Sequence, residues 1–146
     1  MRVIWFWGPT GYGKDRRAAF ECQRQGLTMA RIAVTKDPQW FDGYSGQQAL
    51  ILSDFKGDNA LAEVLSWLDG HPLNLRIKGS FTVALYTTVF VTSIDPPHAF
   101  YRLGNGVLEL VRRVTDVVEF KVPWRPIGPE RAPVVQRIED SENWEF

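Results

Sequence analysis

The sequence predicts an α/β domain in which helices cover both faces of a mainly parallel sheet. Short apolar runs, which are typical of strands, alternate along the chain with segments of helical periodicity. A glycine-rich stretch, Gly8 to Lys14, joins the first apolar run to the first helical segment. Ligands of such sheets bind at the carboxyl ends of the strands, and this stretch lies at one of those ends.

Five apolar runs predict the strands of the sheet. They are residues 3–7, 30–34, 49–52, 86–92 and 115–121, and the runs at 49–52 and 86–92 are typical of buried strands. Residues 75–83 alternate about Lys78-Gly79-Ser80, which predicts a hairpin.

Helical segments separate these strands. The first covers residues 15–25 and is ended by Gly26. The second has apolar residues at positions 61, 64, 65 and 68, with Asp58 or Asn59 as its expected cap. A short helix is expected to start at Asp95-Pro96-Pro97, with the aspartate as cap, and another is expected to open at Asn105.

Composition and length restrict the class of protein. The 146 residues suit one domain, and 45% of them are hydrophobic, which is enough for a real core. The formal net charge is zero, so any site for nucleic acid must be a local basic feature. Cys22 is the single cysteine and is expected in the core, so neither an internal disulfide nor a zinc set is predicted. We expect an intracellular protein without a membrane span or a membrane partner.

The character of the chain changes after Val122. Four prolines follow, and the end of the chain is polar and acidic without a long apolar pattern. We therefore expect a domain at residues 1–122 and a flexible tail at residues 123–146.

The stretch after the first strand matches the phosphate-binding pattern G-x-x-x-x-G-K. A loop that wraps a triphosphate aims several backbone N–H groups at one point, and glycine permits that approach. Lys14 is expected to reach the β and γ phosphates, and the N-terminus of the following helix is expected to face the same anion. The expected nucleotide-binding residues of this segment are Gly8, Pro9, Thr10, Gly11, Tyr12, Gly13, Lys14 and Asp15.

Two later strands also end in residues suited to a nucleotide site. Asp54 comes just after the apolar run at 49–52. At such a strand end, an acid can present its carboxylate to the Mg²⁺ of a bound nucleotide or to the attacking water. Thr92 and Ser93 end the run at 86–92 and are expected to sense the γ phosphate. The alternative readings are that Asp54 only begins a turn, and that Thr92 and Ser93 only cap the helix that follows.

Several motifs in order give the chain a family resemblance. They are Gly-Pro-Thr-Gly-x-Gly-Lys at 8–14, Trp40-Phe41-Asp42-Gly43-Tyr44-x-Gly46, Asp54-Phe55, Lys78-Gly79, Val91-Thr92-Ser93 and Arg112-Arg113-Val114-Thr115. Over residues 2–121 the chain resembles the superfamily 3 helicase domain of replication initiator (Rep) proteins of circular single-stranded DNA viruses of the circovirus and nanovirus kind, which is related to viral RNA helicases. The resemblance implies a three-layer, AAA+-like phosphate-loop NTPase domain around a five-stranded sheet.

The resemblance also implies roles for particular residues. It implies an ATPase that forms a ring, usually hexameric, and pulls on single-stranded DNA or RNA in a host nucleus or cytoplasm. The loop from Gly8 to Lys14 would hold ATP, Asp54 would orient the lytic water, and Lys78 would meet the nucleic acid backbone in the pore. Arg112 and Arg113 match the pair that includes the arginine finger for a neighbouring subunit. A turn lysine at 78 and a surface role for one arginine are the alternatives.

Three positions depart from the family pattern. Asp15 stands where Ser or Thr binds Mg²⁺, Ser53 stands where the first acid of a pair is usual, and Ile94 stands where many members have Asn. The carboxylate and hydroxyl beside the metal therefore look exchanged, and the expected metal ligands are Asp15, Ser53 and Asp54. There are two alternative functions. One is a nucleotide-binding assembly module that scarcely hydrolyses ATP, and the other is a nucleotide kinase.

Overall fold

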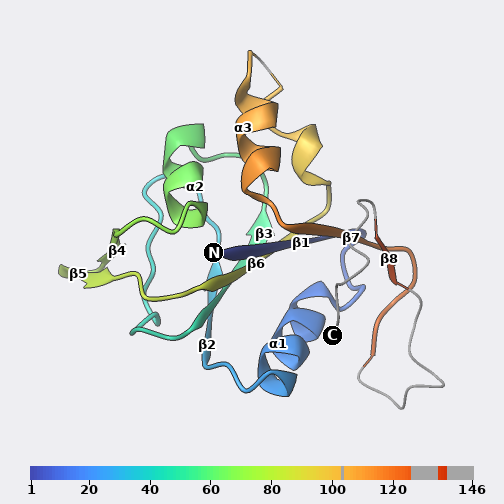
Figure 1. Ribbon diagram of the computed structural model, residues 1–146, viewed down its shortest axis with the longest axis horizontal. Coiled ribbons are helices and arrows are strands. Elements are labelled where there is room, and N and C mark those ends of the chain that lie inside the picture. The colour runs from blue at the N-terminus through green and yellow to red at the C-terminus, as the bar shows by residue number, and fades with distance from the viewer. Residues whose placement is uncertain (103, 126–134, 138–146) are drawn as a thin grey trace.

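The computed structural model describes residues 1–102, 104–125 and the backbone of 135–137, and it has the predicted α/β architecture (Figure 1). Five strands run parallel in one sheet: β2 (Met29–Ala33), β3 (Ala49–Phe55), β6 (Thr88–Ser93), β1 (Arg2–Trp7) and β7 (Asp116–Phe120), in that spatial order. This confirms the predicted mainly parallel, five-stranded sheet. A short strand in the predicted tail, β8 (Val135–Arg137), pairs antiparallel with β7.

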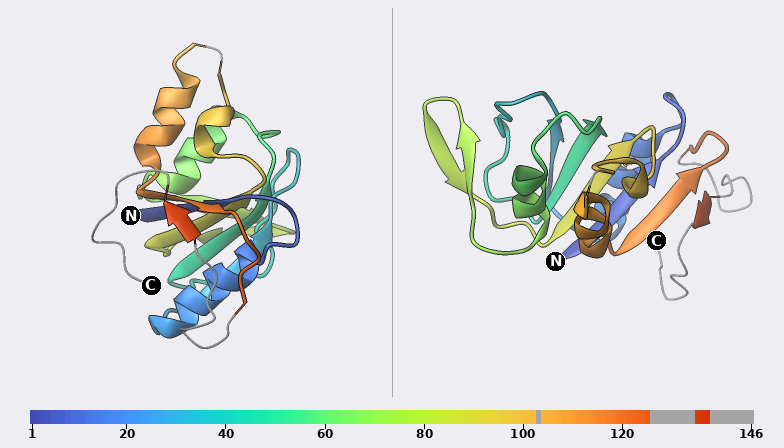
Figure 2. Two further views of the ribbon diagram at one scale, coloured as in Figure 1. Left: turned by 90° about the vertical axis from the view of Figure 1, so that its right-hand side faces the viewer. Right: turned by 90° about the horizontal axis from the view of Figure 1, so that it is seen from above.

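Helices cover both faces of the sheet, as Figure 2 shows. On one face lies α1 (Lys14–Arg24), and on the other lie α2 (Leu61–Leu68), the 3-10 helix η1 (Pro97–Ala99) and α3 (Gly106–Arg113). Strand β1 is apolar on both faces because it lies between these layers. Val3 and Trp5 pack in the core beneath α2 and α3, while Ile4 and Phe6 pack against the side of α1.

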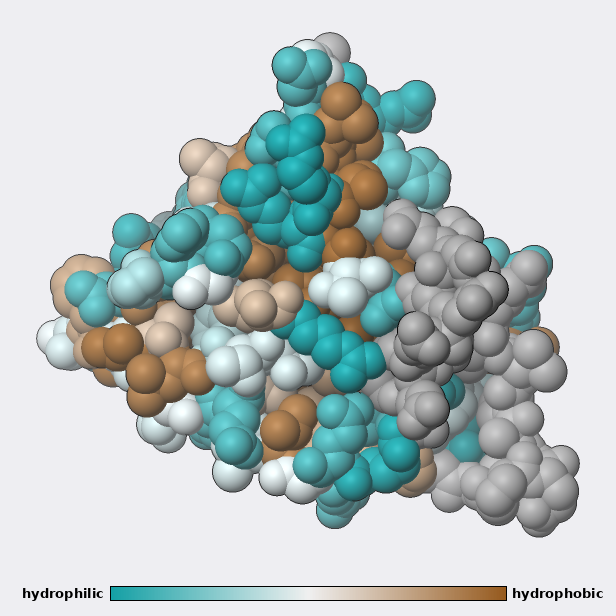
Figure 3. All heavy atoms as spheres, viewed as in Figure 1, coloured by the Kyte–Doolittle hydropathy of each residue, from teal (hydrophilic) through white to brown (hydrophobic). Residues whose placement is uncertain are grey.

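The hairpin forms as predicted, outside the main sheet. Strands β4 (Asn74–Ile77) and β5 (Ser80–Val83) pair antiparallel and are joined by Lys78 and Gly79. Gly79 has a φ of 81°, which glycine adopts without strain. The hairpin projects beyond the β2 edge of the sheet (Figure 2). Figure 3 shows hydrophobic side chains gathered at this projecting end, where Phe81 and Val83 are exposed.

The helix starts differ from the sequence expectation at two places. The cap position of helix α2 is held by Ala60, whose side chain has no acceptor, and the buried Asn59 lies one residue earlier, where its Nδ2 donates to the carbonyl of Thr35 at 2.9 Å. The segment after Asp95 forms only a three-residue 3-10 helix, whose cap position is held by Pro96. Asn105 does precede α3, as expected.

Packing continues beyond the expected end of the domain at residue 122. The side chain of Trp124 is 5% exposed, and its ring centroid lies 5.2 Å from that of Phe20 on α1. The backbone N–H of Trp124 donates to the carbonyl of Tyr12 at 2.9 Å. The chain is therefore fixed to the phosphate loop as far as residue 124, and the predicted tail beyond residue 125, apart from β8, lies outside the described residues.

Candidate nucleotide-binding site

The loop that follows β1 requires glycine at both of its ends. A Cβ on Gly8 would lie 2.7 Å from the carbonyl oxygen of Phe120, and one on Gly13 would lie 2.7 Å from that of Trp124. Both glycines have φ in the positive range, 149° and 81°. The N–H of Gly8 donates to the carbonyl of Ser93 at 3.1 Å. Neighbouring strand ends and the segment after β7 thus hold the loop in place.

The loop leads into the N-terminus of α1, which begins at Lys14. Its cap residue is Gly13, and no side chain caps the first turn. The N–H groups of that turn and the positive end of the helix dipole are therefore directed toward the pocket, an arrangement that binds anions. The ammonium of Lys14 donates to the carbonyls of Gly8 and Pro9 within the loop. Burial lowers the pKa of Lys14, although the charges of Asp15 and Asp54 oppose that shift.

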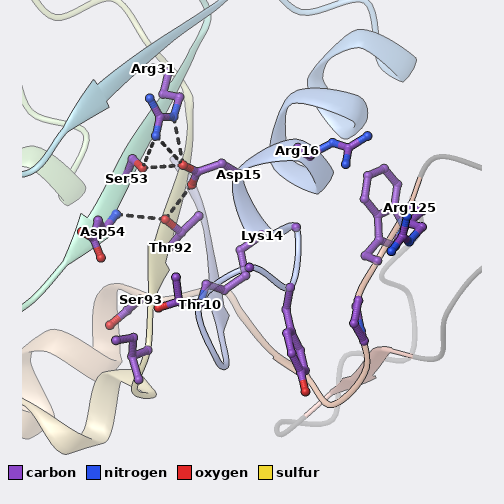
Figure 4. A pocket seen from close by; sticks show the side chains of 16 residues that line it. Thr10, Lys14, Asp15, Arg16, Arg31, Ser53, Asp54, Thr92, Ser93 and Arg125 are labelled. Carbon is purple, nitrogen blue, oxygen red and sulfur yellow. Dashed lines mark hydrogen bonds and ion pairs between the residues drawn. The ribbon is translucent and has the colours of Figure 1, made fainter.

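A cavity of about 470 Å³ opens over the loop and over the carboxyl ends of β3 and β6. The loop from Thr10 to Lys14 lines it on one side, and Pro123, Trp124 and Arg125 line it on another. Its lining includes four basic side chains, Lys14, Arg16, Arg31 and Arg125, and two acidic ones, Asp15 and Asp54 (Figure 4). This excess of positive charge favours an anionic ligand.

Asp15, which follows the loop lysine, lies at the centre of a hydrogen-bonded cluster (Figure 4). Ser53 Oγ donates to Asp15 Oδ2 at 2.5 Å, and Thr92 Oγ1 donates to Asp15 Oδ1 at 2.8 Å. Three segments far apart in the sequence therefore meet at one carboxylate. Burial acts to raise the pKa of Asp15, but the hydrogen bonds of Ser53, Thr92 and Arg31, with the charge of Arg31, outweigh it, so that its pKa is lowered.

Arg31 is the residue of this cluster that the sequence reasoning missed. Its Nε lies 2.9 Å and its Nη2 2.7 Å from Asp15 Oδ2, and Nη2 also donates to Ser53 Oγ at 3.0 Å. The sequence did contain a clue to Arg31, because it lies between two apolar residues of a predicted strand. Alternation along a strand places Arg31 on the opposite face from Ala30 and Ile32. Only the sheet order, with β2 next to β3, shows that this face is the one that meets Asp15.

Asp54 lines the pocket and has an unusual backbone. Its φ is 66°, and the pairing of β3 with β6 changes register between Leu52 and Phe55, so Asp54 lies at a bulge. The left-handed conformation is costly for a residue with a side chain, and bulges of this kind re-aim side chains at sites. The carboxylate is 59% exposed and lies 3.3 Å from Lys56 Nζ.

Thr92 and Ser93 line the pocket at the end of β6, but their hydroxyls differ in use. Thr92 Oγ1 accepts from the N–H of Asp54 at 3.0 Å, besides donating to Asp15. Ser93 Oγ donates to the carbonyl of Phe55 at 2.9 Å, so it joins β6 to the bulge. Ile94 lines the pocket and is 50% exposed.

The cluster does not fit Mg²⁺ as a set of protein ligands. Both carboxylate oxygens of Asp15 accept hydrogen bonds from protein groups, and a guanidinium lies where a cation would bind. Ser53 Oγ likewise both donates to Asp15 and accepts from Arg31. Of the two aspartates among the expected ligands, only Asp54 has a largely exposed carboxylate. Among the described residues, no group of three or more acidic, histidine or cysteine side chains is arranged to hold a metal ion.

The remaining predicted residues lie outside this pocket. Lys78 is exposed at the tip of the hairpin, where its backbone N–H donates to Asp42 Oδ1 at 2.9 Å. Arg112 and Arg113 lie on α3, which covers the other face of the sheet from α1. Both contact Glu109 of their own helix, at 3.3 and 3.1 Å. The structure thus brings together the loop, Asp15, Ser53, Asp54, Thr92 and Ser93, and it places Lys78 and the two arginines elsewhere.

Comparison with known proteins places the chain in a family. The family model described as RNA helicase matches residues 4–93. The chain is 30% identical over 116 residues to the replication-associated protein of beak and feather disease virus, covering 80% of this chain and 38% of that protein. It is 34% identical over 99 residues to that of pigeon circovirus (68% and 29%) and 30% identical over 118 residues to that of porcine circovirus 2 (78% and 36%). The chain thus spans less than two fifths of the length of these relatives.

The fold and the glycine-bounded loop define a domain of the phosphate-loop NTPase class. The chain belongs to the RNA helicase family, as a superfamily 3 helicase domain of the Rep type. No helix in the described part of the chain is long and apolar enough to cross a membrane.

Proposed function

We propose that this domain binds ATP at the Gly8–Lys14 loop and hydrolyses it to move along single-stranded DNA or RNA during viral-type genome replication. The observation that carries the proposal is the uncapped N-terminus of α1 beneath a loop that permits only glycine at Gly8 and Gly13, with Lys14 alongside. This arrangement gathers backbone donors and one ammonium around a single anion. The relatives' description as replication-associated proteins supports the setting inside a host cell, in its nucleus or cytoplasm.

Each strand end next to the loop has a role in this proposal. Asp54 orients the lytic water, for which its exposed carboxylate at a bulge is suited. Thr92 and Ser93 hold the strand end that faces the γ phosphate. The exposed carboxylate of Asp54 would be the protein group available to hold Mg²⁺, which would supply positive charge to the nucleotide phosphates. The expected participation of Asp15 and Ser53 as ligands would first require release of Arg31.

We further propose that turnover takes place between subunits of a homo-oligomeric ring, with a hexamer as the expected form. Among the described residues, the hydrogen bonds and ion pairs of Arg112 and Arg113 are made with Glu109, and neither arginine lines the pocket. They are therefore suited to act on the nucleotide of a neighbouring subunit. Lys78, exposed at the hairpin tip, is the proposed contact with the nucleic acid backbone.

The test compares Lys14→Ala with the control Lys36→Ala, since Lys36 is exposed and lines no part of the pocket. We expect Lys14→Ala to remove most of the ATP affinity measured by titration calorimetry, while Lys36→Ala binds like the parent. ATP hydrolysis with and without single-stranded DNA, and particle mass with ATP, then test the helicase reading. Unchanged ATP affinity in Lys14→Ala would exclude the phosphate-loop proposal.

A second candidate function is supported by a specific observation. Arg31 pairs with the carboxylate at the position where the family has a metal-binding hydroxyl, and Ile94 replaces a polar residue at the pocket. These features favour a nucleotide-binding assembly module with weak hydrolysis. Ring formation upon ATP addition, with no turnover stimulated by single-stranded DNA, would select this candidate over the helicase.

A further inference from the structure

Asp15 and Arg31 form an ion pair in the pocket. The inference drawn from this ion pair rests on the proposed ATP binding. We propose that Arg31 is a built-in cation of the nucleotide site, which replaces a divalent metal at Asp15 and makes ATP binding largely independent of Mg²⁺. The first step is geometric. The guanidinium contacts one carboxylate oxygen, Asp15 Oδ2, through both Nε and Nη2, at 2.9 and 2.7 Å.

The second step concerns the oxygen atoms around Asp15. Asp15 Oδ2 accepts from Ser53 and Arg31, and Asp15 Oδ1 accepts from Thr92. Ser53 Oγ accepts from Arg31 in turn. A metal would have to displace the guanidinium from two oxygens before it could bind here. The guanidinium therefore competes directly with any divalent cation.

The third step concerns the triphosphate. Asp15 lies in the first turn of α1, next to the loop lysine, so its bare carboxylate would repel an anion held there. Arg31 offsets that charge and itself lines the pocket with a side chain that is 58% exposed. Its hydrogen bonds and ion pair with the described residues run through Nε and Nη2, so that Nη1 can donate to a phosphate oxygen. In this site the charge of Asp15 consequently needs no metal for its neutralisation.

The competing arrangement is the usual one, in which the residue after the lysine requires Mg²⁺. If Asp15 were unpaired, metal-free ATP would be repelled by this carboxylate, since both are negatively charged. Removal of Arg31 should create that situation. The variant Arg31→Met keeps much of the side chain's length and removes its charge, while Arg31→Lys keeps the charge but has a single nitrogen for Asp15 and Ser53.

The experiment measures the dissociation constant of ATP by titration calorimetry, in excess Mg²⁺ and in excess EDTA. We expect the two constants of the wild-type chain to agree within about threefold, and those of Arg31→Met to differ by about tenfold or more. Arg31→Lys should fall between them, and Lys36→Met, a charge loss outside the pocket, should behave as wild type. In the absence of nucleotide, Mn²⁺ measured by electron paramagnetic resonance should bind to Arg31→Met more tightly than to wild type.

The outcomes separate the two proposals. Wild-type ATP binding that needs Mg²⁺ as strongly as that of Arg31→Met would overturn this inference and leave the proposed function in place. Absence of ATP binding to the wild-type chain under both conditions would overturn the proposed function, and this inference with it. Equal Mn²⁺ affinity in wild type and Arg31→Met would show that the guanidinium does not compete for Asp15.

Discussion

Ser53 Oγ donates a 2.5 Å hydrogen bond to Asp15 Oδ2, and this contact joins the end of β3 to the first turn of α1. The two positions are those at which the sequence exchanges the family's hydroxyl and carboxylate. At these positions the serine hydroxyl on the strand therefore donates to the carboxylate on the helix.

The first prediction is that the exchange is coupled. Asp15→Thr leaves Arg31 without its carboxylate, and Ser53→Asp crowds two carboxylates together, so each should lower ATP turnover by about tenfold. The double variant restores the usual arrangement of the family and should recover or exceed the starting rate. Turnover is measured at saturating Mg²⁺ and ATP. Simple addition of the two single effects in the double variant would mean that the residues act independently.

The second prediction compares two glycines of the loop. Gly11 and Gly13 have nearly the same φ, 83° and 81°, but a Cβ on Gly11 meets nothing within 4 Å, whereas one on Gly13 meets the Trp124 carbonyl at 2.7 Å. Gly11→Ala should cost about 1 kcal/mol of unfolding free energy through backbone strain alone. Gly13→Ala should cost about 2 to 4 kcal/mol, because it also displaces residue 124. Urea unfolding followed by tryptophan fluorescence measures both, and equal costs would contradict the close packing of the Trp124 carbonyl on Gly13.

The third prediction concerns Cys22, which is 0% exposed. Burial raises the pKa of its thiol to about 11, with a further contribution from the charge of Glu21. The thiolate is thus disfavoured in the folded state, so the thiol's contribution to stability is full below its unfolded pKa and is lost as the pH rises toward 11. We expect a folded chain at pH 8 to resist alkylation by iodoacetamide, and urea to restore rapid labelling. Rapid labelling without urea would place Cys22 at the surface.

The fourth prediction tests the hairpin lysine. If Lys78 contacts a nucleic acid backbone, Lys78→Ala should reduce DNA-stimulated turnover several-fold more than basal turnover. It should also lower the dependence of strand binding on salt concentration, by about one unit in the logarithmic slope. Lys36→Ala serves as the control for loss of one exposed charge. Equal loss of basal and stimulated turnover would assign the hairpin a structural role.

The fifth prediction tests the arginines of α3. A chain carrying Lys14→Ala cannot hold ATP well, and a chain carrying Arg112→Ala and Arg113→Ala cannot supply the proposed finger. Each should be nearly inactive alone, because an arginine that acts across an interface contributes orders of magnitude in rate. Mixed rings should regain part of the activity, measured as ATP turnover after mixing. No recovery in samples shown by native mass spectrometry to contain both chains would argue against action in trans.

The sequence predicted those parts of the fold that depend on local patterns. The loop from Gly8 to Lys14 and the hairpin about Lys78 each carry residue types that only a few backbone conformations accept. The buried runs that became β3 and β6 were recognisable because strands covered on both faces are continuously apolar. The α/β class predicted that the strands are mainly parallel, but it did not give their full order in the sheet.

Three features could not be read from the sequence, because each depends on which segments become neighbours. The link between Arg31 and Asp15 required β2 to lie beside β3. The start of α2 at Ala60 places Asn59 one residue before the cap position, where its Nδ2 donates to the carbonyl of Thr35. Trp124 looked like part of a proline-rich tail, since the aromatic surface of Phe20 that receives it lies more than 100 positions earlier.

The fixed position of Trp124 has a mechanical consequence. Its N–H donates to the carbonyl of Tyr12, and its own carbonyl lies against Gly13, so residue 124 is held directly beside the phosphate loop. A force that displaced residue 124 would therefore be transmitted to the loop through two backbone contacts. Conversely, any shift of the loop upon triphosphate binding would displace residue 124.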